Sequence, residues 1–567
     1  MDSHTYPGRG LSVSQLIFAL NEELKRVAYS PPFTLEAVSQ LNRDASLALA
    51  TIREWRNSFA CVNRIPMDVL TLIPAHFISQ RDRFRVASVC RHWRGVFLMH
   101  GALWSQIFLR MGEECVSILL ERAKGSPLDI IVHRHDPIGT IALISPRAQQ
   151  IRSLEFRNRN WLDIIAVSEF NSGQLPLLRT LKINCLRTFD WYSPTVVTPP
   201  SPTSFRGFAN LEEFVFTSGT LSLLGHLVFP KLTTFELCST PDSECNALHL
   251  LEFLKASPLL NTVKLKISAA VVLRGVPQEM VVLLPNVETF SLHLAEDPTS
   301  EVYNIAAHIS CPFSRDTSLM HNMDDGNVAD SLGVFPAPIL WDTIIHRYMA
   351  SPIEEVTLEI KGLEEEEIES LLTFQSSDAT IFRLGFNVDR TDVDEDELDM
   401  SLVEMGWKIF SQALITIRDH PLLSNVKRLH IKYKAAVPNA YLTDVAHGIR
   451  ELFESLGPLD ELTIRGCDLR VFLPHFLDSS WPDELEKPIV FLRTKELTIL
   501  HLSMEVDEME CASAILKLAK SQHALAIPFE RVTVHMEWIP GEIEEELRRW
   551  VGAVDFHEDE YMEYMES

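Results

Sequence analysis

The fold is decided by a short pattern that is clearest in two stretches, LNTVKL at residues 260–265 and VETFSL at residues 287–292. In both, apolar residues occupy the first, fourth and sixth positions. Successive side chains of a β-strand point to opposite faces, so the fourth and sixth residues would lie on one face. Each stretch therefore predicts a short strand with one buried face.

The same pattern recurs along most of the chain. It starts at residues 151, 178, 211, 232, 260, 287, 353, 381, 426, 459 and 529, with a weaker copy at Leu497-Thr498-Ile499. Most neighbouring starts are 21 to 33 residues apart, a spacing typical of repeats that stack side by side. Stretches with helical periodicity separate several copies, at residues 247–255, 406–418, 441–456 and 511–520. Strands that alternate with helices predict a parallel sheet with right-handed crossovers.

This pattern resembles that of the leucine-rich-repeat family, in which a strand lines a concave sheet and a helix returns along the convex side. The resemblance implies an α/β fold, with an irregular leucine-rich-repeat solenoid over residues 111–554. The asparagine of the family's turn is absent from most copies. Another α/β protein with buried parallel strands would also contain such apolar triplets, so that alternative stays open. Residues 187–206 and 297–338 interrupt the period and are expected to be surface loops.

A second patterned stretch precedes the repeats at residues 64–98, with the sequence RIPMDVLTLIPAHFISQRDRFRVASVCRHWRGVFL. Pro66 and Asp68 suit the first turn of a helix, where a missing N–H is harmless and the helix dipole favours an anion. A capping-box spacing that begins at Ser79 indicates a second helix start. Apolar residues then recur at roughly helical intervals over residues 84–97. We therefore expect three short helices that share one apolar seam.

This stretch resembles the F-box, the module by which a subunit of a cullin-based ubiquitin ligase docks on a Skp-type adaptor. The residues that carry the likeness are Ile65-Pro66, Val69-Leu70, Ile73 and, most specifically, VASVCRHWR at residues 86–94. The resemblance implies an F-box-like module at residues 61–110 that binds a Skp-type adaptor and, through it, a cullin. The implied adaptor-binding residues are Ile65, Pro66, Leu70, Ile73, Val89 and Trp93. The first four would expose an apolar strip, and the last two would close the interface.

Two further features of this module bear on its partner. Pro74 departs from the family pattern, which has an aromatic residue there, and it predicts that the first helix is kinked or ends early. Residues 64–100 contain six arginines and two aspartates, a net charge of plus four, although the whole chain carries −27. A basic module on an acidic chain suits an acidic partner. The alternative that stays open is that these helices only cap the repeats.

Composition limits the classes of function. The 51 basic and 78 acidic residues argue against binding to a phosphate backbone, so no nucleic-acid partner is expected. The nine cysteines are odd in number and contain no C-x-x-C pair, which indicates neither a disulfide framework nor a zinc site. No apolar run is long enough to span a bilayer. We therefore expect no membrane partner and a cytoplasmic or nuclear location.

No motif for catalysis or cofactor binding was found. Glycine is scarce, at 22 residues, and the usual phosphate loops and nucleophile elbow are absent from the sequence. The aspartates between 392 and 396 imitate the start of a calcium loop, but Glu397 replaces the glycine that makes its turn. His133 and His135 follow a short predicted strand and have no obvious further ligands. We expect no enzyme activity, no cofactor and no metal site.

The remaining segments complete the expected layout. Residues 11–27 and 34–59 have helix-spaced apolar residues and are expected to form a supporting helical pair within residues 1–60, and residues 555–567 an acidic tail. The whole is similar to F-box proteins of mushroom-forming fungi. This resemblance predicts a subunit that recruits an unknown target protein through its repeat face. The alternative is a repeat scaffold or inhibitor whose helical head only caps the solenoid.

Overall fold

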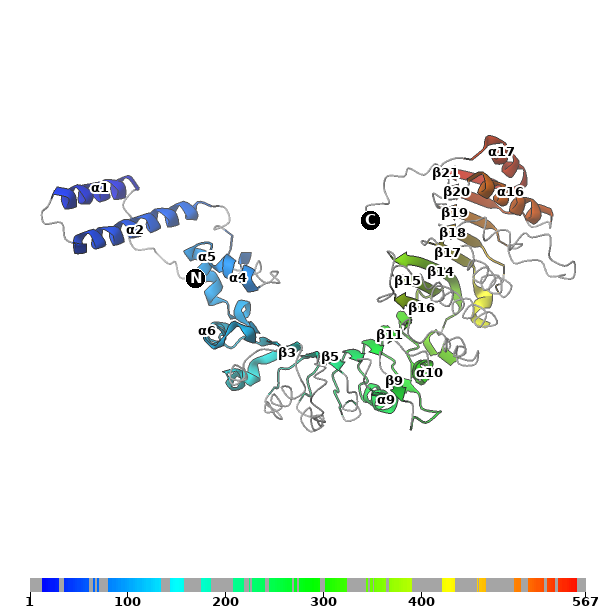
Figure 1. The fold of residues 1–567 in the computed structure, drawn as a ribbon, viewed down its shortest axis with the longest axis horizontal. Coiled ribbons are helices and arrows are strands. Elements are labelled where there is room, and N and C mark those ends of the chain that lie inside the picture. Colours follow the sequence, from blue (N-terminus) through cyan, green and yellow to red (C-terminus); the bar gives the residue numbers. More distant parts are fainter. Residues whose placement is uncertain are drawn as a thin grey trace, which may run out of the picture. The chain divides into compact units, whose positions relative to one another are not determined.

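The computed structural model divides the chain into two compact units (Figure 1). The first contains residues 1–131 and 135–151, and the second contains residues 132–134 and 152–567. A helical N-terminal region is followed by a large, mostly parallel sheet, so the chain has an α/β fold. The structure describes residues 13–29, 35–60, 65–66, 69–70, 80–133, 143–157, 175–184, 208–218, 224, 227–239, 244–267, 270–272, 275–295, 301–323, 343–344, 347–349, 351–363, 367–389, 421–433, 456, 458–465, 494–500, 508–524, 528–535 and 539–557.

The first unit is built mainly from helices. Its elements are α1 (Val13–Tyr29), α2 (Leu35–Ser58), α4 (Gln80–Ala87), α5 (Arg91–Met99), η3 (Gly101–Trp104), β1 (Gln106–Phe108), η4 (Leu109–Met111), α6 (Glu113–Ala123), β2 (Leu128–His133) and η5 (Ser145–Gln150). The expected N-terminal helical pair is confirmed by α1 and α2. Strands β1 and β2 pair in parallel, with Ile107 opposite Ile130, and β1 was not predicted from the sequence.

The second unit is organised by one sheet. Its strands are β3 (Ile151–Arg157), β4 (Thr180–Asn184), β5 (Glu213–Ser218), β6 (Thr234–Ser239), β8 (Thr262–Ile267), β11 (Thr289–Ala295), β13 (Asp316–Met323), β14 (Ile353–Leu363), β15 (Glu367–Ser376), β16 (Ile381–Asp389), β17 (Arg428–Tyr433), β18 (Glu461–Arg465), β19 (Glu496–Leu500), β20 (Arg531–His535) and β21 (Ala553–His557). The acidic tail expected from residue 555 overlaps β21 as far as His557, and residues 558–567 lie outside the described part.

Shorter elements accompany this sheet. They are β7 (Glu244–Asn246), α9 (Ala247–Lys255), β9 (Ala270–Val272), β10 (Val282–Leu283), α10 (Glu301–His308), β12 (Ile309–Ser310), η9 (Pro421–Asn425), α16 (Glu508–Ala524) and α17 (Gly541–Trp550). The helix expected at residues 247–255 is confirmed by α9, and the one at 511–520 lies within α16. The helix expected at 406–418 lies outside the described residues, as does the one at 441–456 except for Leu456.

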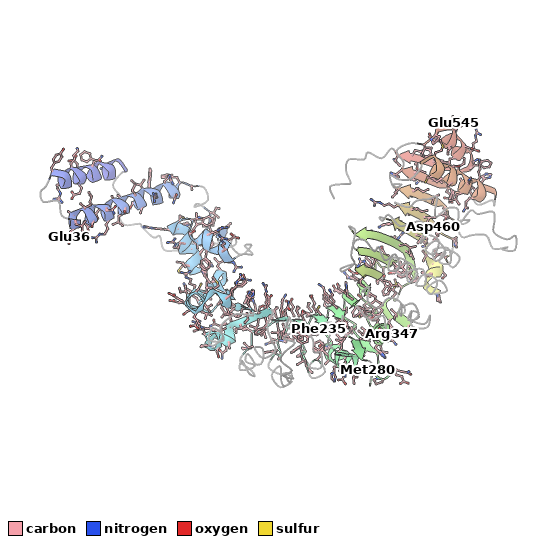
Figure 2. All side chains as sticks on the ribbon, in the orientation of Figure 1. Glu36, Phe235, Met280, Arg347, Asp460 and Glu545 are labelled. Atoms are coloured by element: carbon pink, nitrogen blue, oxygen red, sulfur yellow. The ribbon has the colours of Figure 1, made fainter. Side chains whose placement is uncertain are left out.

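The predicted apolar positions form the core of the sheet. One continuous row crosses the sheet and is buried throughout: Leu154, Leu181, Phe214, Phe235, Val263, Phe290, Thr317, Phe382, Phe374, Val356, Leu429, Leu462, Leu497 and Val532. Helix α9 covers this face, since the Phe253 ring lies 4.6 Å from that of Phe235 (labelled in Figure 2). The period-two pattern thus identified the buried face of the strands.

Three neighbouring strands break the parallel order and correct the prediction. Strands β14, β15 and β16 pair antiparallel, and the order across the sheet is β13, β16, β15, β14, β17. Short connections, residues 364–366 and 377–380, join the three strands. A parallel crossover needs about a dozen residues, so these strands can only turn back on one another. The repeats predicted at 353 and 381 form strands, but β15 separates them.

The loop expected at residues 297–338 is wrong for its first part. Helix α10 and strands β12 and β13 occupy residues 301–323, and β13 pairs in parallel with β11 and β16. The pattern was hidden because Ser314 and Thr317 stand at two of its apolar positions, although both are fully buried. The rest of this stretch, and the whole loop expected at 187–206, lie outside the described residues.

Candidate functional site

The strongest candidate site is the α4–α5 region of the first unit. Backbone amides of Val69 and Leu70 both donate to the Pro66 carbonyl oxygen at 3.0 Å, so a helical turn starts at Pro66 as predicted. Helix α5 begins after Cys90, whose Sγ accepts a hydrogen bond from the Trp93 amide at 3.5 Å. A thiol is a weak acceptor, yet it fills the place of an N-cap oxygen here. The CRHW sequence therefore sets the start of α5.

Aromatic residues hold these helices on the rest of the unit. Helix α5 buries Trp93 and Phe97, whose ring centroids are 5.6 Å apart. The buried Trp104 donates from Nε1 to the Phe97 carbonyl oxygen at 2.8 Å and lies 5.4 Å from the Phe84 ring. The polar end of a buried tryptophan needs such a partner. The short helices thus share one aromatic core.

Helix α6 closes this core from the other side. The Arg122 guanidinium lies over the Trp104 ring, 4.9 Å from its centroid, in cation–π geometry. A Cβ added at Gly101 would overlap the carbonyl oxygen of Ala123 at the end of α6. Only glycine allows η3 to approach α6 so closely. The α4–α5 region is therefore tied to the strand and helix that follow it.

Two of the basic side chains form hydrogen bonds with the backbone and so stabilise the fold. Arg83 Nη1 donates to the Leu103 carbonyl oxygen at 3.4 Å, and burial lowers the pKa of Arg83, partly offset by Asp129. Arg94 Nε donates to the Ala87 carbonyl oxygen at 3.3 Å, which links the end of α4 to α5. Arg83 thus ties α4 to η3, and Arg94 braces the turn between α4 and α5.

The exposed side chains of the region include two valines and several basic residues. Val89, in the turn between α4 and α5, is 60% exposed, and Val69 is 46% exposed. Exposed basic or ionisable side chains accompany them: Arg81, Arg85, Arg91, His92 and Arg94. Exposed valines with cationic neighbours suit a partner that has an apolar groove with an acidic rim.

The predicted adaptor-binding residues fall into different environments. Val89 and Pro66 are exposed, and Ile65 is half-buried. Leu70 is fully buried and Trp93 is 7% exposed, so the expectation that Leu70 lies in an exposed strip is wrong. Ile73 and Pro74 lie outside the described residues. The roles of these residues in adaptor binding stay predictions.

Val69 is the exposed residue that sequence reasoning did not select. Adjacent residues of a helix point about 100° apart, so Val69 and Leu70 cannot both face inward. The sequence shows two neighbouring apolar residues, and only the packing of the unit decides which of them is covered. The same packing turns Trp93 inward.

A second candidate surface is the polar face of the sheet, formed by the side chains that alternate with the buried rows. Cations and anions of neighbouring strands pair along it: Lys182 with Glu213 at 2.7 Å, Arg428 with Glu355 at 2.9 Å, and Arg383 with Asp316. Arg179 pairs with Glu212 at 3.2 Å, just before β4 and β5. A face with both signs of charge suits a protein partner.

His430 is a partly buried member of this face. Its Nε2 lies 3.5 Å from a Glu355 oxygen. Burial lowers the pKa of His430, and the negative charge of Glu355 opposes that shift. The ring therefore tends to be neutral near pH 7, and Glu355 forms its charged hydrogen bond with Arg428 instead.

The other expectations concern sites that were set aside. Among the described residues, no group of three or more histidine, cysteine or acidic side chains is arranged to hold a metal ion. His133 ends β2, and His135 and the aspartates at 392–396 lie outside the described part. The described helices include none with the length and apolar character needed to cross a bilayer.

Comparison with known families adds one match. Residues 62–110 match the family described as F-box-like, so the chain contains an F-box-like domain there. The match covers the α4–α5 region, its exposed valines and the Gly101 contact. No curated protein matches the chain.

Proposed function

We propose that this protein is a substrate-recruiting subunit of a cullin-based ubiquitin ligase. The observation that carries the proposal is the F-box-like match at residues 62–110, which coincides with the exposed Val69 and Val89 and their basic surroundings. F-box domains generally dock on Skp-type adaptors. The expected role is to hold a target near the ligase in the cytoplasm or nucleus and to catalyse no reaction itself.

The target would bind the polar face of the second unit. We propose that this unit is an irregular leucine-rich-repeat solenoid, supported by the repeat spacing and the parallel strands β3 to β13. The antiparallel strands β14 to β16 depart from such a repeat. Paired charges of both signs favour a folded protein as the target over a polyanion.

The test is a titration of the purified full chain with a Skp-type adaptor. Val89→Asp should weaken binding at least tenfold, because it places a charge in the apolar centre of the proposed contact. Val228→Asp is the matched control, since Val228 is 62% exposed in the second unit and should have no effect. Replacing Ile65 and Pro66 together by alanine should also weaken binding, roughly ten- to a thousandfold.

Buried positions need separate treatment in this experiment. Leu70→Ala and Trp93→Ala should lower binding only together with the stability of the first unit, because both side chains are buried. A folded full chain that does not bind the adaptor would reject the ligase role. The alternative of a repeat scaffold or inhibitor, with its helical head as a cap, would then remain.

A further inference from the structure

Helix α2 carries a seam that is characteristic of helical bundles. Apolar residues alternate at spacings of three and four from its second turn to just beyond its end: Val38, Leu41, Ala45, Ala48, Ile52, Trp55 and Phe59. This is a period of 3.5 residues, which keeps one stripe facing neighbouring helices along the whole length. A seam of this kind normally lies in the core of a coiled coil or four-helix bundle.

The seam is only partly covered by α1. Figure 1 shows α1 and α2 side by side, and residues 30–34 connect them, so the two helices form an antiparallel hairpin. Helix α2 has 24 residues and α1 has 17. No side chain described between residues 15 and 60 is buried, and Trp55 and Phe59 are 56% and 55% exposed. The seam thus has room for further helices.

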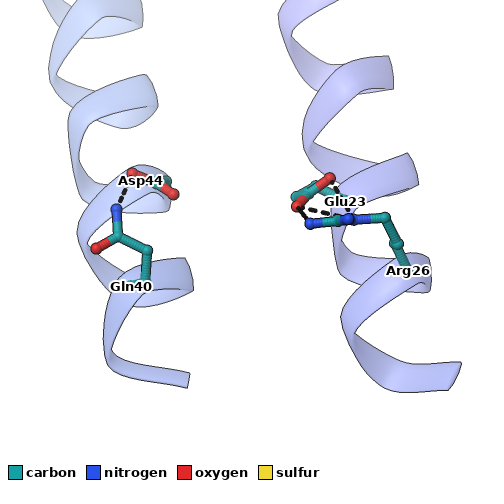
Figure 3. A network of polar contacts seen from close by, with 4 residues as sticks. All are labelled: Glu23, Arg26, Gln40 and Asp44. Atoms are coloured by element: carbon teal, nitrogen blue, oxygen red, sulfur yellow. Dashed lines mark hydrogen bonds and ion pairs between the residues drawn. The ribbon is translucent and has the colours of Figure 1, made fainter. Parts of the chain in front are cut away.

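Several polar side chains of the hairpin pair within their own helix. On α1, Arg26 pairs with Glu23 at 2.7 Å and Lys25 with Glu22 at 2.9 Å. On α2, Gln40 donates to Asp44 at 3.0 Å, and Figure 3 shows this contact beside the Glu23–Arg26 pair. Such pairs stabilise each helix by a little and need nothing from outside. What the described side chains of the hairpin lack is apolar cover.

The net charge of the hairpin indicates which kind of partner covers its apolar seam. Residues 13–60 contain five acidic and five basic residues, a net charge of zero, on a chain whose net charge is −27. The two signs are present in equal number on each helix, and they alternate along α2, so a second hairpin meets no net repulsion. A strongly basic or acidic partner would gain nothing from a neutral surface. Self-association is the arrangement that this balance fits.

We propose that the α1–α2 hairpin is a dimerisation element, in which the hairpin of a second copy covers the seam and completes a four-helix bundle. At 1.5 Å per residue, α2 is about 36 Å long and α1 about 26 Å, and each is about 10 Å wide. This face is on the order of 600 Å², about three quarters of the roughly 800 Å² per partner of a stable interface. Two F-box-like domains and two sheets would then belong to one assembly.

The test measures the mass of the full chain in solution by light scattering or sedimentation at about 10 μM. The unmodified chain should have twice its chain mass of 64.4 kDa. Ile52→Glu places a carboxylate in the seam and should weaken association at least a hundredfold, giving a monomer. Leu47→Glu is the matched control, because Leu47 lies outside the seam and is 63% exposed, and it should remain dimeric.

Folding is checked in the same samples. Ile52→Glu should leave the unfolding midpoint of the second unit unchanged, so that loss of the dimer is not loss of the protein. A monomeric unmodified chain at this concentration would overturn the proposal. A dimer that survives Ile52→Glu, or one that Leu47→Glu also dissociates, would overturn it as well, because the seam would not be the contact.

Discussion

The α1–α2 hairpin and the sheet of the second unit both carry apolar residues at regular spacing, but only the sheet buries them. Leu429 on β17 is fully buried between rows of similar residues, whereas no described side chain of the hairpin is buried. In the sheet, β17 has the neighbours β14 and β18 on its two sides. The hairpin has two helices and one contact face. Regular apolar spacing therefore predicts which face of an element is apolar, and the number of packed neighbours decides how far that face is buried.

The largest expected effect is in the sheet. Leu429→Ala should lower the free energy of unfolding of the second unit by about 2–5 kcal/mol, because it leaves a cavity in a close-packed row. Leu47→Ala in α2 should change stability by less than about 0.5 kcal/mol. Chemical denaturation followed by tryptophan fluorescence measures both. Equal losses for the two variants would remove the contrast between sheet and hairpin.

The next effect concerns the close contact of η3 with α6 in the first unit. Gly101→Ala should destabilise that unit by about 1–3 kcal/mol, because the added methyl group overlaps the Ala123 carbonyl oxygen. Gly95→Ala is the control, since nothing lies within 4 Å of a Cβ at that position. Thermal unfolding of both variants checks the prediction. A neutral Gly101→Ala would show that η3 can move away from α6.

Two buried polar residues near β13 should respond in opposite directions. The Ser314 hydroxyl can donate to the carbonyl oxygen of Glu288, at 3.1 Å, or to that of Asp316, at 3.0 Å. Ser314→Ala removes this hydrogen bond and should lower the free energy of unfolding by about 1 kcal/mol. The buried Thr317 hydroxyl has no partner among the described residues, so Thr317→Val should be neutral or stabilise by up to about 1 kcal/mol. Unfolding free energies that move in the same direction for both variants would contradict this assignment.

The smallest effect depends on pH, at the turn between β15 and β16. Hydrogen bonds from the hydroxyl of Ser376, and also from Ser351 and Thr380, lower the pKa of Asp378 to about 2. The unfolded value is near 4, so this carboxylate stabilises the fold above pH 4, and the contribution is lost as the pH falls towards 2. Because the carboxylate is largely exposed, the gain is below about 1 kcal/mol. Asp378→Asn should flatten the pH dependence of the unfolding midpoint between pH 5 and pH 2.5, and an unchanged slope would refute the assignment.

The strands show how much of the sheet the local apolar pattern could predict. Ten copies of the apolar pattern predicted buried rows that the structure contains, from Leu154 to Val532, because period-two alternation is a property of the strand itself. Strand β13 was not predicted because Ser314 and Thr317 replace its apolar residues. Hydrogen bonds satisfy the Ser314 hydroxyl there, and Thr317 lies between neighbouring strands on both sides. Strand β15 was not predicted, because a polar residue, the buried Ser376, stands at the last position of its apolar pattern.

The candidate site divides in the same way. The helical turn that starts at Pro66 is a local signal and was predicted from the sequence. The start of α5 after Cys90 is also local, but it was not predicted. The exposure of Val69 and the burial of Leu70 depend on the side from which other elements approach, which a list of apolar residues does not contain. The Gly101 contact joins residues more than 20 positions apart and gives no local signal.

By itself, the sequence determined the helical head, the basic F-box-like stretch and the positions of most strands, since these depend on spacing within a few residues. Only the tertiary structure decided the order of β13 to β17 and the side chains that face outward from α4 and α5. Pairing between strands and packing between helices join residues far apart in the chain. Their free energies depend on neighbours that no short window of sequence includes.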